Sequence, residues 1–295
     1  MVDPDKIHAR ELAIGPLVYH LYAIDQWGAD ILEGIKAQLA SNVITQKADR
    51  KIVLLQDNPT TLRFPENSKD FSIRDVAEGS WQLRKNLVDT TWQSSQSDYT
   101  FWSAGTDASI GPVRFHLPWT LVIDDLVALG GGLMHAGLVC HGESGYLFTA
   151  PPGGGKSTTL KTAPADWQVM SDDAALVWPA DNHWLASPLP SWGDQLRPEK
   201  PWGWSQMKLD ATCVITDILQ LEKGEQIELV KQSPSTALSS IYRALSEYPV
   251  TILADTGYRE QYFRSAAHLA RNLSTWQLTL PKHGDIWPLL QRETQ

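Results

Sequence analysis

The sequence predicts an α/β protein with two parts: a smaller N-terminal α/β unit at residues 1–112 and a P-loop domain, a mixed sheet with flanking helices, at residues 113–295. Three observations support this. Short apolar, strand-like runs alternate with segments whose apolar residues recur at helical spacing. A polar stretch at residues 57–112 separates two such groups. In the second group a glycine-rich loop stands between a predicted strand and a predicted helix, as a phosphate-binding loop does.

The N-terminal unit is predicted from two strands and one helix. Leu17–Ala23 forms an extended apolar segment, Ile31 and Ile35 keep helical spacing, and residues 52–55 form a second apolar run. Within the polar stretch that follows, residues 94–98 are the most linker-like piece, and we place the boundary near residue 112. Nothing in this unit indicates a function.

The second unit contains a denser series of predicted elements. A helix from Pro118 is expected to end at Gly130, because proline suits a first helical turn and a run of glycines ends it. Two short strands, at residues 138–140 and 146–150, lead into the glycine-rich loop. Beyond the loop we expect a short helix from Ser157, strands at 167–170 and 174–178, a hairpin of 214–221 with 227–230, and helices at 235–246 and 258–272.

The glycine-rich loop, Pro151–Thr158, predicts a site for ATP with magnesium. Glycines let successive backbone N–H groups face an anion without interference from a Cβ atom. Lys156 is expected to contact the β- and γ-phosphates, and the Ser157 hydroxyl is expected to ligate Mg²⁺. Ala150 stands where the usual motif has its first glycine, and a glycine-rich turn with an incidental lysine is the alternative. The residues predicted to contact the nucleotide are Gly153, Gly154, Gly155, Lys156, Ser157 and Thr158.

Two further features lie close to the loop. His135 precedes the first of the two short strands, and Asp172 and Asp173 stand together at the end of another, only sixteen residues beyond Lys156. Each has an ordinary structural explanation. A pair of aspartates at a strand end is often a helix cap or a solvated turn, and a histidine among apolar residues is commonly a satisfied core residue.

These motifs together resemble the catalytic domain of HPr kinase/phosphorylase, which phosphorylates a serine on the carrier protein HPr. Residues 187–194, Ser-Pro-Leu-Pro-Ser-Trp-Gly-Asp, extend the likeness to the HPr-kinase-related proteins of SynChlorMet peptide-modification cassettes, over residues 118–280. The resemblance implies an HPr-kinase-like fold. It also implies that the Asp172 carboxylate is the base toward the acceptor hydroxyl and that His135 interacts with this carboxylate. Asp173 would join Ser157 as a ligand of the metal.

The implied function is an ATP-dependent kinase that transfers the γ-phosphoryl group to a serine, or another hydroxyl, of a small protein or ribosomally made peptide. ATP and Mg²⁺ are the implied cofactors. Two alternatives remain open: a non-catalytic nucleotide-binding regulator of a peptide-modifying assembly, and a small-molecule kinase. The family's second signature, which supports phosphorolysis and hexamer contacts, is not found after residue 200, so phosphorolysis is not expected. Whether the chain forms a homo-oligomer stays open.

Composition excludes some partners. With a net charge of −9 and no cluster of Lys and Arg, the chain is not expected to bind nucleic acid. No apolar run is long enough to span a membrane, and the N-terminus lacks an apolar signal segment, so a cytoplasmic protein is expected.

Cys140 and Cys213 have no CxxC partner and are expected to be buried, reduced thiols. The tryptophans between residues 184 and 204 fit either a peptide groove or core packing.

Overall fold

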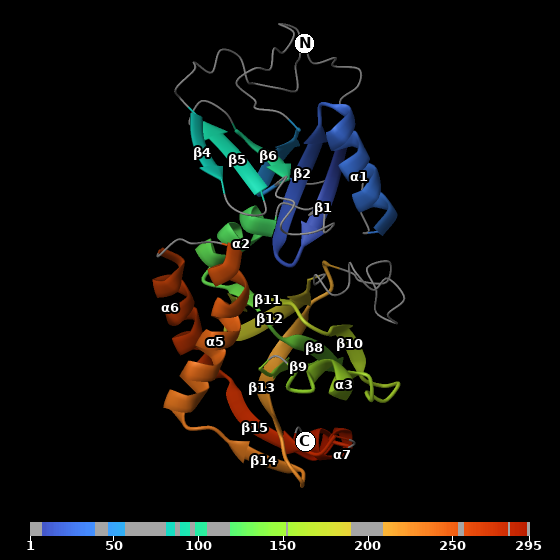
Figure 1. The fold of residues 1–295 in the computed structure, drawn as a ribbon, viewed down its shortest axis with the longest axis vertical. Helices are drawn as coiled ribbons and strands as arrows, with labels where there is room; N and C mark the ends of the chain where they lie inside the picture. Colours follow the sequence, from blue (N-terminus) through green and yellow to red (C-terminus); the bar gives the residue numbers. More distant parts are fainter. Residues whose placement is uncertain are drawn as a thin grey trace, which may run out of the picture. The chain divides into compact units, whose positions relative to one another are not determined.

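The computed structural model describes residues 8–38, 47–56, 81–85, 89–94, 98–104, 119–151, 153–189, 209–252, 257–282 and 284–293. The chain divides into two compact units, Met1–Val122 and Ile123–Gln295. The boundary predicted near residue 112 lies outside the described residues. Both units combine helices with a mixed sheet, which confirms the predicted α/β class (Figure 1).

The N-terminal unit contains a six-stranded sheet with the order β1-β2-β3-β6-β5-β4 among its described residues. The β2–β3 and β3–β6 pairs are parallel, and the other pairs are antiparallel. The predicted strand at Leu17–Ala23 is confirmed as β2. The bounds of the elements are β1 His8–Ile14, β2 Leu17–Ala23, α1 Gln26–Gln38, β3 Arg50–Leu54, β4 Trp81–Lys85, β5 Asp89–Ser94 and β6 Tyr99–Ala104.

Residues 95–97, the middle of the linker-like piece 94–98, lie outside the described residues, but paired strands stand on both sides of them. Strands β5 and β6 form an antiparallel pair around them. These strands contain few aliphatic residues, so polarity suggested a linker. Their buried positions are filled instead by aromatic side chains, including Trp92, Phe101 and Trp102. The buried carboxylate of Asp89 accepts a hydrogen bond of 2.9 Å from the Trp102 indole, which satisfies both groups.

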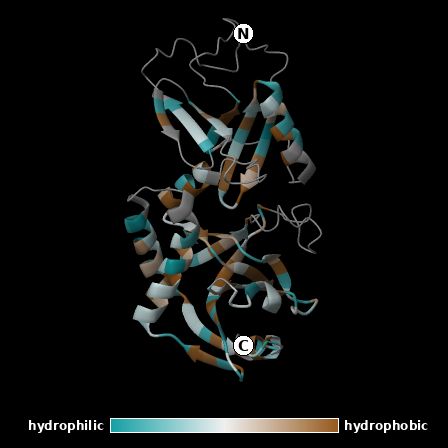
Figure 2. Ribbon diagram, viewed as in Figure 1, coloured by the Kyte–Doolittle hydropathy of each residue, from teal (hydrophilic) through white to brown (hydrophobic). Residues whose placement is uncertain are grey.

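The second unit contains a nine-stranded sheet among its described residues, with the central order β10-β8-β9-β13-β12-β11-β7. Parts of its central strands are hydrophobic and are brown in Figure 2. No helix in the described part of the chain has the length and apolar character that crossing a membrane requires. The bounds are α2 Trp119–Ala128, β7 Gly132–Met134, β8 Gly137–His141, β9 Ser144–Thr149, α3 Lys156–Leu160, β10 Gln168–Ser171, β11 Ala175–Ala180, β12 His183–Pro188, β13 Cys213–Lys223, β14 Glu228–Lys231, α5 Pro234–Ile252, α6 Gly257–Asn272, β15 Ser274–Leu280 and α7 Trp287–Glu293.

The predicted hairpin of residues 214–221 with 227–230, which lie in β13 and β14, is wrong. Strand β15 pairs in parallel with β13 and antiparallel with β14, so it lies between them. Its Leu278 is fully buried and is in register with Leu221 on one side and Leu229 on the other. The turn residues after β13 indicated a change of direction, but a local pattern cannot reveal a partner strand from much later in the chain.

The two cysteines form a disulfide bond, which corrects the prediction of reduced thiols. Strands β8 and β13, which carry Cys140 and Cys213, flank β9 on opposite sides. Gly145 of β9 is in register with Cys140, and a Cβ atom on Gly145 would lie 2.6 Å from the Cys213 sulfur. Because Gly145 has no side chain, the two sulfurs can meet across the middle strand. The sequence showed both cysteines but not this shared neighbour.

Gly145→Ala is expected to destabilise the protein by about 1–3 kcal/mol, the cost of overpacking a close-packed site. The added methyl would also lie 2.8 Å from the Val214 carbonyl oxygen, a backbone atom that cannot rotate away. Urea denaturation followed by tryptophan fluorescence measures the effect. Ser144→Ala, one residue earlier on the same strand, is the control. Equal unfolding midpoints for the two variants would contradict the proposed close approach.

Candidate active site

The glycine-rich loop connects the end of β9 with the start of α3, the position that the sequence predicted. Gly153 and Gly155 adopt φ values of +72° and +100°, a region that residues with a Cβ atom rarely adopt. Gly154 is required for another reason, because a Cβ atom there would lie 2.8 Å from both the Ala150 Cβ and the Pro151 carbonyl oxygen. The three consecutive glycines therefore form a tight loop that bulkier residues would distort.

Lys156 extends from the first turn of α3 into the protein interior. Its side chain is 8% exposed, and its Nζ lies 3.1 Å from Asp173 Oδ1. Burial lowers the pKa of Lys156, and the neighbouring charge of Asp173 opposes only part of that effect. Ser157 and Thr158, the next residues, are exposed and accessible to a ligand.

The two aspartates follow β10 and differ in accessibility. Asp172 is 1% exposed, whereas the Asp173 side chain is 31% exposed. Asp173 also contacts His135, whose Nε2 lies 2.7 Å from Asp173 Oδ1. The resemblance implied that His135 holds Asp172, but the hydrogen bond found here joins His135 to Asp173. Asp173 therefore lies between an ammonium group and an imidazole.

Glu247 of α5 completes this cluster and was not predicted. Its Oε2 lies 2.8 Å from His135 Nδ1, so the imidazole bridges two carboxylates. Burial lowers the pKa of His135, but the hydrogen bonds to Asp173 and Glu247 and the charge of Asp173 outweigh burial and the charge of Lys156. The pKa of His135 is consequently raised. Glu247 lies in an amphipathic helix far from the loop in sequence, and no local motif distinguishes it from a surface carboxylate.

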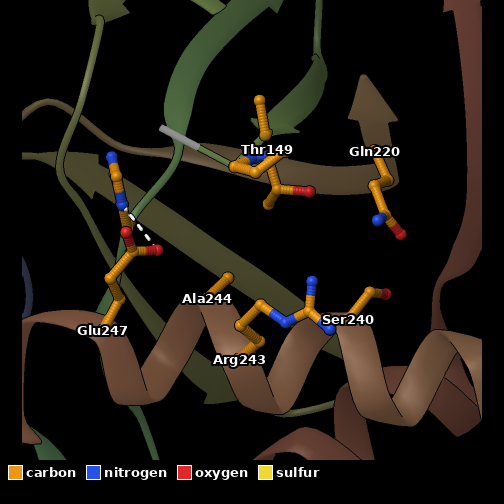
Figure 3. Close-up of a pocket in the computed structure, with 9 residues that line it drawn as sticks. Thr149, Gln220, Ser240, Arg243, Ala244 and Glu247 are labelled. Atoms are coloured by element: carbon orange, nitrogen blue, oxygen red, sulfur yellow. Dashed lines mark ion pairs between the residues drawn. The ribbon is translucent and has the colours of Figure 1, made fainter. Parts of the chain in front are cut away.

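A cavity of about 380 Å³ adjoins the loop and this cluster. Strands β9 and β13 and helix α5 contribute to its wall, and the dashed line in Figure 3 marks the ion pair between His135 and Glu247. Its described lining consists of His135, Thr149, Ala150, Pro151, Gln220, Ser240, Arg243, Ala244 and Glu247. The start of the glycine-rich loop and the histidine thus face one cavity.

One comparison with known proteins, a match to a family model, agrees with the motif analysis. The family model described as SynChlorMet cassette protein ScmC matches residues 106–294. The chain belongs to the ScmC family. This confirms the predicted resemblance to the HPr-kinase-related cassette proteins. This chain is also similar to a solved structure titled as the Hpr(Ser) kinase/phosphatase from Coxiella burnetii, with 13% sequence identity and a TM-score of 0.30. The match covers 55% of this chain and 91% of that chain. Among curated proteins, no relative was found.

The site residues fit magnesium that is held together with a nucleotide. Among the described residues, no group of three or more His, Cys, Asp and Glu side chains is arranged to hold a metal ion alone. Mg²⁺ commonly takes one or two protein oxygens and completes its coordination with substrate phosphates and water. The exposed Ser157 hydroxyl and the partly exposed Asp173 carboxylate are donors of this kind.

Some predicted residues lie outside the site or outside the described part of the chain. Trp184 of β12 is buried, and its ring centroid lies 5.3 Å from that of His268. This tryptophan is therefore a core residue. The later tryptophans of the same stretch lie outside the described residues.

Ala150→Gly is expected to leave nucleotide affinity unchanged or slightly improved. Within the described residues, Asp181 is the one non-glycine residue with positive φ, so Ala150 adopts a conformation that alanine tolerates. Calorimetric titration with Mg-ATP measures the effect. Binding at least tenfold weaker than in the unaltered chain would show that the alanine methyl is needed and that the loop alignment is wrong.

Proposed function

We propose that this chain is an ATP-dependent kinase that transfers the γ-phosphoryl group to a serine, or another hydroxyl, of a small protein or ribosomally made peptide. The observation that carries the proposal is the contact between the phosphate loop and the carboxylate cluster. Lys156 of the loop lies 3.1 Å from Asp173, which in turn contacts His135. A nucleotide bound at the loop would therefore present its terminal phosphate beside these carboxylates.

The loop residues bind and orient the nucleotide in this proposal. Lys156 exchanges its contact with Asp173 for the β- and γ-phosphate oxygens, and backbone N–H groups of the glycines donate to the same phosphates. Ser157 and Asp173 would hold magnesium, which supplies charge neutralisation on the transferring group when it is bound. Phosphoryl transfer depends mostly on such positioning and charge stabilisation, and this loop offers both.

The aspartate pair supplies the proton acceptor. A serine hydroxyl is a weak nucleophile, and a carboxylate that accepts its proton during attack lowers the barrier. We assign this role to Asp172, the neighbour of the metal-binding Asp173. His135, held between Asp173 and Glu247, orients the second carboxylate. A regulator that only binds nucleotide would have no need for a proton acceptor beside the terminal phosphate.

Incubation of the full chain with γ-labelled ATP, Mg²⁺ and serine-containing precursor peptides encoded beside its gene tests the proposal. Transfer of label to a peptide serine, identified by mass spectrometry, is the expected result. Slow ATP hydrolysis without a peptide is a weaker supporting readout. Saturable nucleotide binding with neither transfer nor hydrolysis would contradict the kinase and favour the regulator.

A further inference from the structure

We propose that the end of the cavity formed by Gln220 and Arg243 binds a carboxylate of the phosphoryl acceptor. The preferred acceptor would then carry an acidic group close to the hydroxyl that is phosphorylated. This inference rests on the proposed function and names the substrate chemistry of the same site. It is carried by side chains that the proposed reaction does not use.

One face of α5 supplies both ends of the cavity. Ser240, Arg243 and Glu247 are separated by three and four residues, so they project from the same side of the helix. Glu247 is engaged with His135 at one end. Figure 3 shows Arg243 extending from α5 toward the strands that carry Thr149 and Gln220. The cavity thus has a carboxylate and imidazole end and, one helical turn away, an end with a guanidinium group.

Hydrogen bonds orient the Gln220 amide. Its Oε1 accepts a 2.7 Å hydrogen bond from Gln232 Nε2. The Oε1 of Gln232 in turn accepts a 3.2 Å hydrogen bond from the Ser240 hydroxyl. These hydrogen bonds use the carbonyl oxygen of Gln220, and among the described residues its two N–H donors have no acceptor, so they remain for a ligand. An amide without this network could turn either its oxygen or its nitrogen toward the cavity.

Arg243 adds a positive charge that no described neighbouring group compensates. Within the described ranges, Arg243 has no ion pair, and the one acidic residue lining the cavity, Glu247, is paired with His135. The guanidinium group has a planar fork of donors that matches a carboxylate or a phosphate. Two neighbouring donors without an acceptor, one of them charged, are a recognition site for an anionic oxygen group.

The position of the cavity end that Gln220 and Arg243 form favours the acceptor, and not the nucleotide, as the source of the anion. The nucleotide phosphates already have a donor set in Lys156 and the glycine backbone. Glu247 and Arg243 are one helical turn apart, and the pitch of an α-helix is about 5.4 Å. Neighbouring Cα atoms in a peptide are about 3.8 Å apart. An acidic residue one or two positions from a serine can therefore reach Arg243 while the serine lies beside the histidine cluster.

The test compares two synthetic peptides that differ at one position. Both are N-acetylated and C-amidated, with the sequences Ala-Gly-Ser-Glu-Gly-Ala and Ala-Gly-Ser-Gln-Gly-Ala. The full chain with Mg-ATP is expected to phosphorylate the Glu peptide with a KM at least tenfold lower, which corresponds to about 1.4 kcal/mol. Calorimetry with a non-hydrolysable ATP analogue measures the same preference as binding. Equal KM and equal affinity for the two peptides would overturn the proposal.

Variants of Arg243 assign the preference to this side chain. Arg243→Met is expected to raise the KM of the Glu peptide about tenfold and to leave that of the Gln peptide within about twofold. Arg243→Glu is expected to reverse the preference toward a peptide with Lys in place of Glu, a gain that a folding defect cannot produce. Arg264→Met is the matched control, because Arg264 is exposed on α6 and pairs with Glu260 outside the cavity.

The outcomes separate this inference from the proposed function. Weaker Mg-ATP binding in Arg243→Met, with the peptide preference intact, would show that this end serves the nucleotide and would overturn the inference. Analogue-dependent binding of the Glu peptide without phosphorylation would contradict the kinase but support the anion site. Phosphorylation of both peptides with equal KM would support the kinase and contradict the anion site.

Discussion

Asp172→Asn is expected to lower the rate of phosphoryl transfer by about 10²- to 10⁴-fold while Mg-ATP binding persists. The amide keeps the shape of the carboxylate but cannot accept the hydroxyl proton. Asp172 is 1% exposed, so the isosteric amide also avoids opening a gap in a buried position. Initial rates with labelled ATP and calorimetric titration of the same sample measure the two quantities. Full activity in this variant would contradict the assignment of Asp172 as base.

Asp173→Asn is the matched comparison and is expected to behave differently. The substitution removes the charge that lies 3.1 Å from Lys156 and the acceptor of the 2.7 Å hydrogen bond from His135. Magnesium-dependent nucleotide binding is therefore expected to weaken together with turnover. If Asp173→Asn lost turnover alone and Asp172→Asn kept it, the roles of the two aspartates would have to be exchanged. Glu247→Gln, which perturbs His135 without touching either aspartate, controls for displacement of the histidine.

Lys156→Met is expected to remove most of the stabilisation that Mg-ATP gives the folded protein. A ligand that binds only the native state stabilises it by about 2.7 kcal/mol at a hundredfold excess over its Kd. In the proposed site Lys156 provides the charge that faces the phosphates, and methionine approximates its apolar stem. Thermal denaturation with and without Mg-ATP measures the shift. Lys161→Met is the control, because Lys161 follows α3 and is exposed.

The Lys156→Met substitution also changes the protein without ligand. Removing a partly desolvated ammonium group also leaves Asp173 without its cationic neighbour. The unliganded Lys156→Met protein can therefore have a different melting temperature, and the comparison uses the ligand-induced shift of each variant. An undiminished shift in Lys156→Met would show that this lysine does not contact the nucleotide phosphates.

Local motifs predicted the part of the site that lies on consecutive residues. The loop at Gly153–Ser157 and the aspartate pair each follow a short apolar strand, so neighbouring residues carry the signal. Glu247 and Arg243 could not be found in this way. Their spacing on α5 is that of any amphipathic helix, and only the fold brings them to the same cavity as residues of β9 and β13. The sequence therefore indicated the side of the cavity that the glycine-rich loop forms, and not the opposite wall.

The fold was predicted where apolar periodicity is strong and missed where it is weak. The aliphatic segment Leu17–Ala23 was recognised as a strand, whereas the polar and aromatic strand Asp89–Ser94 falls in the polar stretch at residues 57–112, where no strand was predicted. The order of the second sheet depends on the late strand β15, which separates β13 from β14. The disulfide depends on two strands that flank Gly145. Both features are set by tertiary pairing, which local sequence does not encode.

Calorimetric titration of the full chain with ATP, in the presence and absence of Mg²⁺, tests whether the chain binds a nucleotide. The proposed nucleotide site predicts saturable binding of one nucleotide per chain that depends on Mg²⁺ and is lost in Lys156→Met. It also predicts that Lys161→Met binds as the unaltered chain does. Absence of saturable binding at millimolar Mg-ATP, together with an unchanged melting temperature, would contradict the nucleotide site and the kinase that is built on it.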